Sequence, residues 1–93
     1  MAENPNKVIC LILEDIANLY EKKRPTEKTH LPWKKAKNEI KNLDYKITNK
    51  EEALKVKGIG PKISDVIHYS LTKNFAALEP DIRSIVERYA HRL

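Results

Sequence analysis

Two glycines, Gly58 and Gly60, constrain the fold of this chain more than any other feature of its sequence. They are the only glycines among the 93 residues, and they flank one aliphatic residue, Ile59. Glycine reaches backbone angles that other residues resist, so we expect a tight turn here with Ile59 entering an apolar core. Pro61 suits the first turn of a following helix, because its fixed φ is helical and its missing N–H would have no intrahelical partner. The stretch therefore predicts a helix, a short hairpin and a second helix.

Phosphate-binding features gather around this turn. The second helix would begin with backbone N–H groups that have no intrahelical partner, the positive end of its dipole and Lys62, all within one turn. The charge of the chain is distributed in the same way. Its formal net charge is +5, and residues 22–62 carry thirteen Lys and Arg against five Asp and Glu. Because these basic residues surround the turn, we expect a polyanion to bind there.

The rest of the chain is patterned as helix. Apolar residues recur at intervals of three and four, and no stretch alternates as a β-strand would. We therefore predict an all-α fold, a compact bundle of roughly four to five helices, with one domain over residues 1–73 and a C-terminal helix over residues 74–93. The expected helices cover residues 5–21, 30–43, 49–56, 61–71 and 80–91.

Three of these helices are preceded by capping signals. Asn4 stands before Pro5, which suits the first turn of the first helix, and Thr29 stands before the second helix. Thr48 and Glu51 have the spacing of a capping box ahead of the short third helix. These signals predict where the three helices begin.

The short helix before the turn and the last helix each need a cover for their apolar residues. The short helix is expected to bury Ala53 and Leu54. The last helix directs Arg83, Arg88 and Arg92 outward. Its apolar face either closes the core of the domain or docks on another protein. The residues expected on that face are Ile82, Ile85, Val86 and Tyr89.

The helix expected over residues 30–43 has two different faces. Trp33 is in register with the apolar face, which favours a role as a core anchor over stacking on a base. The remaining surface is rich in lysine, which either solubilises the helix or contacts phosphates. The lysines to which we assign phosphate contact are Lys34, Lys35 and Lys37.

The residues that catalytic sites require are absent or scattered. The three histidines are far apart in the sequence, the carboxylates are dispersed, and the turn lacks the longer cradle of a P-loop. Cys10 is the only cysteine, so neither a disulfide framework nor a cysteine-based metal site is expected. We therefore expect no metal, no cofactor and no catalysis. The apolar run over residues 8–13 is too short to span a bilayer, so no membrane partner is expected.

The turn resembles the helix-hairpin-helix DNA-binding element, in which two glycines flank an aliphatic residue and Pro61 and Lys62 open the next helix. The resemblance implies that the N–H groups around Gly58 and Gly60 meet phosphate oxygens, with Lys62 adding charge. Recognition would then concern the DNA backbone and its shape rather than base sequence. The predicted bundle thus contains one helix-hairpin-helix motif, and residues 1–73 would be a DNA-binding domain. The DNA-binding residues assigned to the motif are Lys57, Gly58, Ile59, Gly60 and Lys62.

A wider set of residues looks like the small N-terminal domain shared by family X DNA polymerases and the Mus-eighty-one crossover-junction endonuclease. The entry Val56-Lys57-Gly58 is similar to the endonuclease form, whereas polymerases of this family typically have Leu-Pro-Gly. The resemblance to the polymerase branch places the Schiff-base lysine of a deoxyribose-phosphate lyase four residues beyond Lys62, where this chain has Val66. The match covers roughly residues 6–72 and consists of Trp33-Lys34-Lys35-Ala36-Lys37, Glu52-Ala53 and Lys57-Gly58-Ile59-Gly60.

The resemblance implies a nuclear, non-sequence-specific DNA-binding module of a structure-selective DNA repair or recombination endonuclease. The module would have no catalysis of its own, because the nuclease metal ligands are absent from these residues. Its partners would be duplex, flap or branched DNA and a repair scaffold protein such as Slx-four. Two alternatives stay open: a deoxyribose-phosphate lyase domain of a family X polymerase, and a protein-interaction module that uses the last helix.

Overall fold

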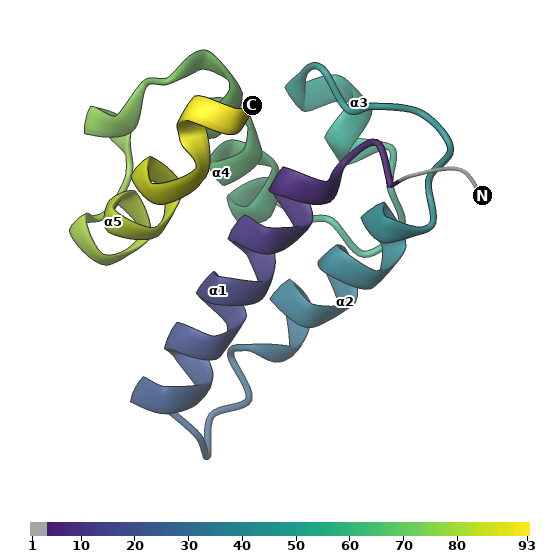
Figure 1. The fold of residues 1–93 in the computed structure, drawn as a ribbon. Coiled ribbons are helices and arrows are strands. Elements are labelled where there is room, and N and C mark those ends of the chain that lie inside the picture. Colours follow the sequence, from purple (N-terminus) through teal and green to yellow (C-terminus); the bar gives the residue numbers. More distant parts are fainter. Residues whose placement is uncertain (1–3) are drawn as a thin grey trace.

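The computed structural model describes residues 4–93, and every regular element in this range is helical. The prediction of an all-α fold is therefore confirmed (Figure 1). Within this range, five α-helices and two short 3₁₀ turns follow one another along the chain. Their bounds are α1 Lys7–Lys23, α2 Leu31–Lys41, α3 Lys50–Leu54, α4 Pro61–Thr72, η1 Phe75–Ala77, α5 Pro80–Tyr89 and η2 Ala90–Arg92.

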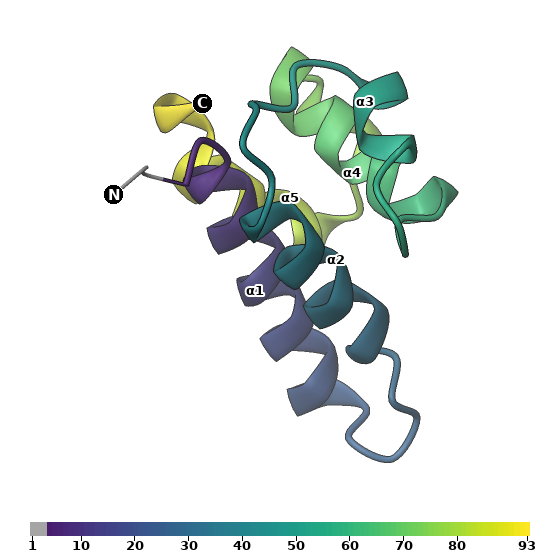
Figure 2. The same ribbon diagram turned by 90° about the vertical axis from the view of Figure 1, so that its right-hand side faces the viewer.

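Helix α1 packs against two other helices, α2 and α5. Helix α2 lies antiparallel beside it, α5 packs on it as well, and α3 and α4 form a separate pair (Figures 1 and 2). Trp33 of α2 is only 4% exposed, and its ring stacks on that of Tyr20 with 5.8 Å between centroids. Trp33 is therefore a core anchor, as predicted. The buried residues of α1 are Ile9, Cys10, Ile12, Leu13, Ile16 and Ala17.

The start of α1 differs from the prediction. The helix begins at Lys7, so Asn6 occupies the N-cap position rather than Asn4. The side chain of Asn6 is buried and makes no capping bond; its Nδ2 donates to the carbonyl oxygen of Tyr45 (2.9 Å), and its Oδ1 accepts from the N–H of Ile47 (2.8 Å). Asn6 thus links the α2–α3 connection to the beginning of α1 by two hydrogen bonds. Capping signals in the sequence do not predict this long-range role.

We predict that Asn6→Ala lowers the free energy of unfolding by about 2 kcal/mol, because it leaves the buried N–H of Ile47 without a partner. Urea denaturation followed by circular dichroism measures this change. Asn18→Ala, on the exposed face of the same helix, is the control and should change stability by less than about 0.5 kcal/mol. Equal effects of the two substitutions would contradict the role assigned to Asn6.

Helix α2 starts without a side-chain cap. It begins at Leu31, and His30 holds the N-cap position in a helical conformation. The prediction that Thr29 caps this helix is therefore wrong. Pro32 lies in the first turn instead, where its fixed φ favours the helix and its missing N–H leaves no donor unsatisfied.

The N-cap of α3 lies one residue later than in the predicted pair, Thr48 and Glu51. Asn49 is the N-cap, and its Oδ1 accepts from the N–H of Glu52 at 2.9 Å. Glu52 reaches back and accepts from the backbone N–H of Thr48 at 3.0 Å and from its hydroxyl. These hydrogen bonds, the hydroxyl one first, lower the pKa of the Glu52 carboxyl. Asparagine is at least as good an N-cap as threonine, so the later of two overlapping frames forms.

The side chains that α3 buries differ in part from the prediction. Ala53 is fully buried, as predicted, but Leu54 is 44% exposed, so the prediction that it is buried is wrong. Val56, just beyond the helix, points into the core in its place and is 7% exposed. The last residue that packs into the core before the hairpin is therefore Val56, which follows α3.

Helix α5 covers its apolar face against the rest of this chain. Ile82, Ile85 and Val86 are buried in the same core as the residues of α1. The hydroxyl of Tyr89 donates to the Asp15 carboxylate at 2.6 Å, and this hydrogen bond raises the pKa of Tyr89. The prediction that Arg83 points outward is wrong. Its guanidinium donates to two carbonyl oxygens, that of Phe75 (3.0 Å), which begins η1, and that of Leu78 (3.1 Å), which follows it.

Candidate nucleic-acid interface

The two hairpin glycines have different backbone conformations. Gly58 has φ +87°, a value that side-chain-bearing residues rarely adopt, so the predicted need for glycine is confirmed there. Gly60 has φ −95° and ψ −175°, an extended conformation open to any residue, so the same prediction is wrong for Gly60. A Cβ added at Gly60 would meet no atom within 4 Å. The fold therefore requires a glycine at position 58 but gives no reason for one at position 60.

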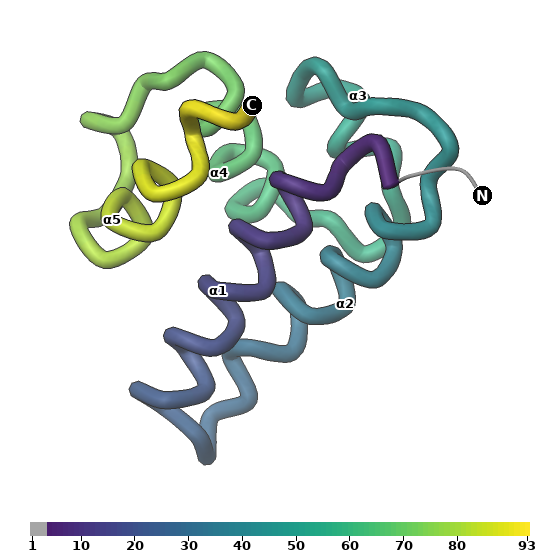
Figure 3. The backbone as a smooth tube through the Cα atoms, viewed as in Figure 1, coloured from purple at the N-terminus to yellow at the C-terminus, as the bar shows by residue number. Residues whose placement is uncertain are grey.

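Figure 3 traces the backbone from α3 through the hairpin into α4. Gly58 and Gly60 of the hairpin are exposed, whereas Ile59 between them is buried. Ile59 is 7% exposed, and its N–H donates to the carbonyl oxygen of Val56 at 3.2 Å. The N–H groups of Gly58 and Gly60, on either side of it, donate no hydrogen bond to any residue between 4 and 93. The first backbone bond of α4 runs from Ser64 to Gly60 at 3.1 Å, so the dipole end of this helix adjoins the same donors.

Two of the predicted lysines lie at this hairpin. The side chain of Lys35 passes under Gly58, with its Cε 3.4 Å from the position that a Cβ at Gly58 would take. Lys57 precedes Gly58 in the chain and is exposed. Among residues 4–93, neither lysine forms an ion pair with a carboxylate. Their charges are thus available beside the exposed N–H groups.

The other two predicted lysines of α2 face α1. Lys34 pairs with Glu21, with 3.2 Å between Nζ and Oε2, and Lys37 approaches Glu14 at 3.9 Å. Residues 34 and 37 are three apart and share one side of the helix, whereas residue 35 is turned by about 100° towards the hairpin. The structure therefore brings Lys35 to the glycine turn and does not bring Lys34 or Lys37 there.

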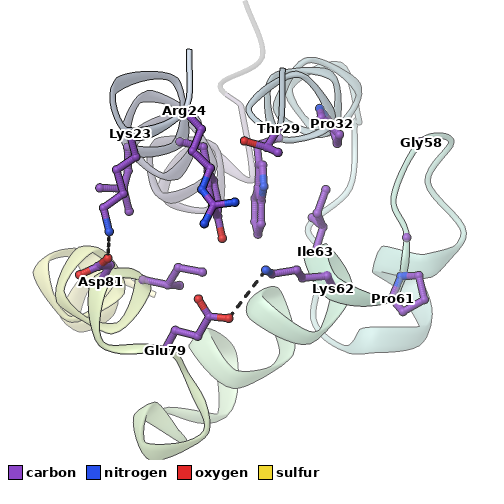
Figure 4. Close-up of a pocket in the computed structure, with 15 residues that line it drawn as sticks. Lys23, Arg24, Thr29, Pro32, Gly58, Pro61, Lys62, Ile63, Glu79 and Asp81 are labelled. Atoms are coloured by element: carbon purple, nitrogen blue, oxygen red, sulfur yellow. Dashed lines mark hydrogen bonds and ion pairs between the residues drawn. The ribbon is translucent and has the colours of Figure 1, made fainter. Parts of the chain in front are cut away.

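Lys62 extends into a cleft of about 800 Å³ beside the hairpin (Figure 4). Its Nζ lies 5.6 Å from the centre of the Tyr20 ring and 3.8 Å from Oε1 of Glu79. The end of α1 adds Lys23 and Arg24 to the same cleft. Sequence reasoning missed these two residues. Their only signal was a run of basic residues at the end of a helix, and only the packing of α1 near α4 brings them to Lys62.

Groups suited to catalysis are few in the part of the chain that the structure describes. Within residues 4–93, no group of three His, Cys, Asp or Glu side chains is placed to hold a metal ion. The thiol of Cys10 is buried, and burial raises its pKa, which disfavours the nucleophilic thiolate. None of the helices between residues 4 and 93 has the length and apolar character needed to cross a membrane.

The chain belongs to the helix-hairpin-helix domain family, whose model matches residues 4–74. The match includes the glycine hairpin and ends before α5. It confirms the predicted helix-hairpin-helix motif and supports DNA binding as the general function. No curated protein and no solved structure shows a significant match to this chain.

The two glycines should respond differently to alanine. Gly58→Ala forces a Cβ into positive φ and should lower the free energy of unfolding by about 1–2 kcal/mol. Gly60→Ala should change it by less than about 0.5 kcal/mol, because its backbone is unstrained and the new methyl group meets no neighbour.

If a phosphate binds the N–H of Gly60, the same Gly60→Ala protein should bind DNA about tenfold more weakly, because a methyl group is added next to that N–H and hinders the contact. Fluorescence anisotropy with a labelled duplex measures this loss, and urea denaturation provides the stability of both variants. Full affinity in a stable Gly60→Ala protein would show that no phosphate approaches this position.

Proposed function

We propose that this chain binds duplex or branched DNA through the sugar-phosphate backbone, without base-sequence specificity. The observation that carries the proposal is the exposed hairpin, where the N–H groups of Gly58 and Gly60 donate to no residue between 4 and 93. Lys35 and Lys57 stand beside them. Two N–H groups without a hydrogen-bond acceptor among residues 4–93, a helix N-terminus and two lysine charges match the oxygens and charge of a phosphate.

The form of the hairpin favours backbone recognition over base reading. Base-specific contacts need side chains that reach into a groove and pair with base edges. The residues exposed at the tip are glycines, and the apolar side chain between them, that of Ile59, is buried. Contacts from backbone N–H groups and lysines position a protein on DNA but carry no sequence information.

We further propose that the chain is the DNA-binding module of a nuclear, structure-selective repair or recombination endonuclease of the Mus-eighty-one type. Its support is the entry Val56-Lys57-Gly58, together with Val66 at the position of the lyase lysine. Val66 is 5% exposed and belongs to the core. A lysine there would place a charge in the core, which is costly, so the packing suits a module without lyase chemistry.

A repair scaffold protein such as Slx-four is the proposed protein partner. Ile82, Ile85 and Val86 of α5 are buried within this chain, so a partner could not use that apolar face without unfolding the helix from α1. A scaffold would instead have to bind the polar outer side of α5, which carries Glu87 and Arg88.

The DNA-binding proposal predicts a strong dependence on salt. If the hairpin and its lysines neutralise three phosphates, affinity for duplex or flap DNA should fall roughly 40-fold between 50 and 200 mM salt. Lys57→Glu combined with Lys62→Glu should abolish measurable binding at the higher salt. Anisotropy titrations with single-stranded, duplex, flap and four-way DNA measure both effects and rank the substrates.

The control for this double substitution is Lys7→Glu combined with Lys46→Glu. It changes the net charge by the same amount, and both residues lie beside the first turn of α1, at the end opposite to the cleft. Binding that is independent of salt, or equal losses in the two double variants, would contradict a hairpin-centred interface.

The second candidate function is the deoxyribose-phosphate lyase, and the cleft favours it. A cleft that holds lysines is what a Schiff-base mechanism needs, and Lys62 and Lys23 line this one. Borohydride reduction with DNA that contains an incised abasic site should trap no adduct if the chain is only a binding module. A covalent adduct that disappears in Lys62→Ala or Lys23→Ala would establish the lyase instead.

A further inference from the structure

The start of α5 brings two carboxylates to the cations of the cleft. Glu79 lies 3.8 Å from Nζ of Lys62, and Asp81 forms an ion pair with Lys23 (Figure 4). Both acids lie beyond residues 4–74, the part of the chain that matches the family. The cleft is therefore a basic surface that a later segment of this chain partly neutralises.

The backbone that carries these acids is firmly attached. Pro80 opens α5, and the guanidinium of Arg83 ties its first turn to the carbonyl oxygens of Phe75 and Leu78. Further along, Ile82 and Val86 are buried in the core. Helix α5 thus holds both carboxylates across from the cations, and a change of partner is an exchange of side chains rather than a movement of the helix.

The ion pairs themselves are accessible. The four side chains are between 50% and 67% exposed, and pairs of this kind are individually weak. A phosphate, which brings several oxygens and a full charge, can therefore replace either carboxylate. The unpaired charge of the displaced carboxylate then stays close to the phosphate and opposes its binding.

We propose that Glu79 and Asp81 form an autoinhibitory contact that competes with DNA phosphates for Lys62 and Lys23. The inference rests on the proposed DNA binding and adds its regulation. The first phosphate contacts form at the hairpin, where Lys35 and Lys57 have no acidic partner among residues 4–93. Contacts in the cleft form only where a phosphate displaces a carboxylate, so the acids restrict the DNA surface that the protein covers.

The experiment compares duplex binding by the full chain and its Glu79→Gln variant, with and without Asp81→Asn, between 50 and 200 mM salt. Each substitution should raise affinity by roughly three- to fivefold at the lower salt. It should also steepen the plot of log affinity against log salt by about 0.9 for each additional phosphate that the protein neutralises. Thermal melts of every variant identify any loss of folding, because Asp81 lies in the first turn of α5.

Two controls test whether any gain in affinity depends on the ion pairs of the cleft. Glu87→Gln removes the same charge from the exposed side of the same helix, away from the residues that line the cleft, and should leave the salt slope unchanged. Lys62→Gln should cancel the gain caused by Glu79→Gln, because the two side chains act on each other.

The outcomes separate the inference from the proposed function. If the unmodified chain binds DNA and neither Glu79→Gln nor Asp81→Asn changes its affinity or salt slope, the inference is wrong, but the proposed DNA binding is not contradicted. The same holds for an equal gain in Glu87→Gln, or a gain that persists with Lys62→Gln. Binding that appears only in the acid-neutralised variants would support it most strongly. If neither the unmodified chain nor any folded variant binds DNA, both proposals are wrong.

Discussion

The positive φ of Gly58 is the constraint on which the rest of this structure depends. It lets the chain reverse between α3 and α4, so that Ile59 enters the core while the glycines on either side stay exposed. A Cβ at this position would be strained by the positive φ, although it would only touch the aliphatic chain of Lys35, which lies beside the turn. One backbone conformation therefore provides both the packing behind the hairpin and the N–H donors in front of it.

The basic residues differ in whether a carboxylate of this chain already pairs with them, and this determines how readily each can bind an anion. Lys34 and Lys37 are directed to acids of α1, and Lys62 shares its charge with Glu79. Lys35 and Lys57 remain at the hairpin with no acidic partner among residues 4–93. The net charge of +5 thus says less about the interface than the positions of the individual carboxylates do. Charges a few ångströms apart dominate the local potential, because solvent and salt screen the more distant ones.

Several sequence-based predictions assigned a role to a residue one or two positions away from the one that has it. The signals at Thr48 and Asn49 overlap, and both frames satisfy the capping pattern, so the pattern alone does not choose between them. The side chain of Asn6 is used for the backbone of the 44–47 connection rather than for its own helix, which no local pattern encodes. The sequence pattern predicts a backbone conformation that requires glycine at both positions 58 and 60, yet only Gly58 has a positive φ.

The sequence by itself determined the helical class, the site of the hairpin, the burial of Trp33 and Ile59, and the glycine requirement at Gly58. These features depend on residue spacing and local backbone preference, which are properties of short segments. The tertiary structure alone decided which lysines reach the hairpin, that Lys23 and Arg24 line a cleft with Lys62, and that α5 places Glu79 and Asp81 opposite them. These relations join residues up to 58 positions apart, and only the packing of α1, α4 and α5 sets their distances.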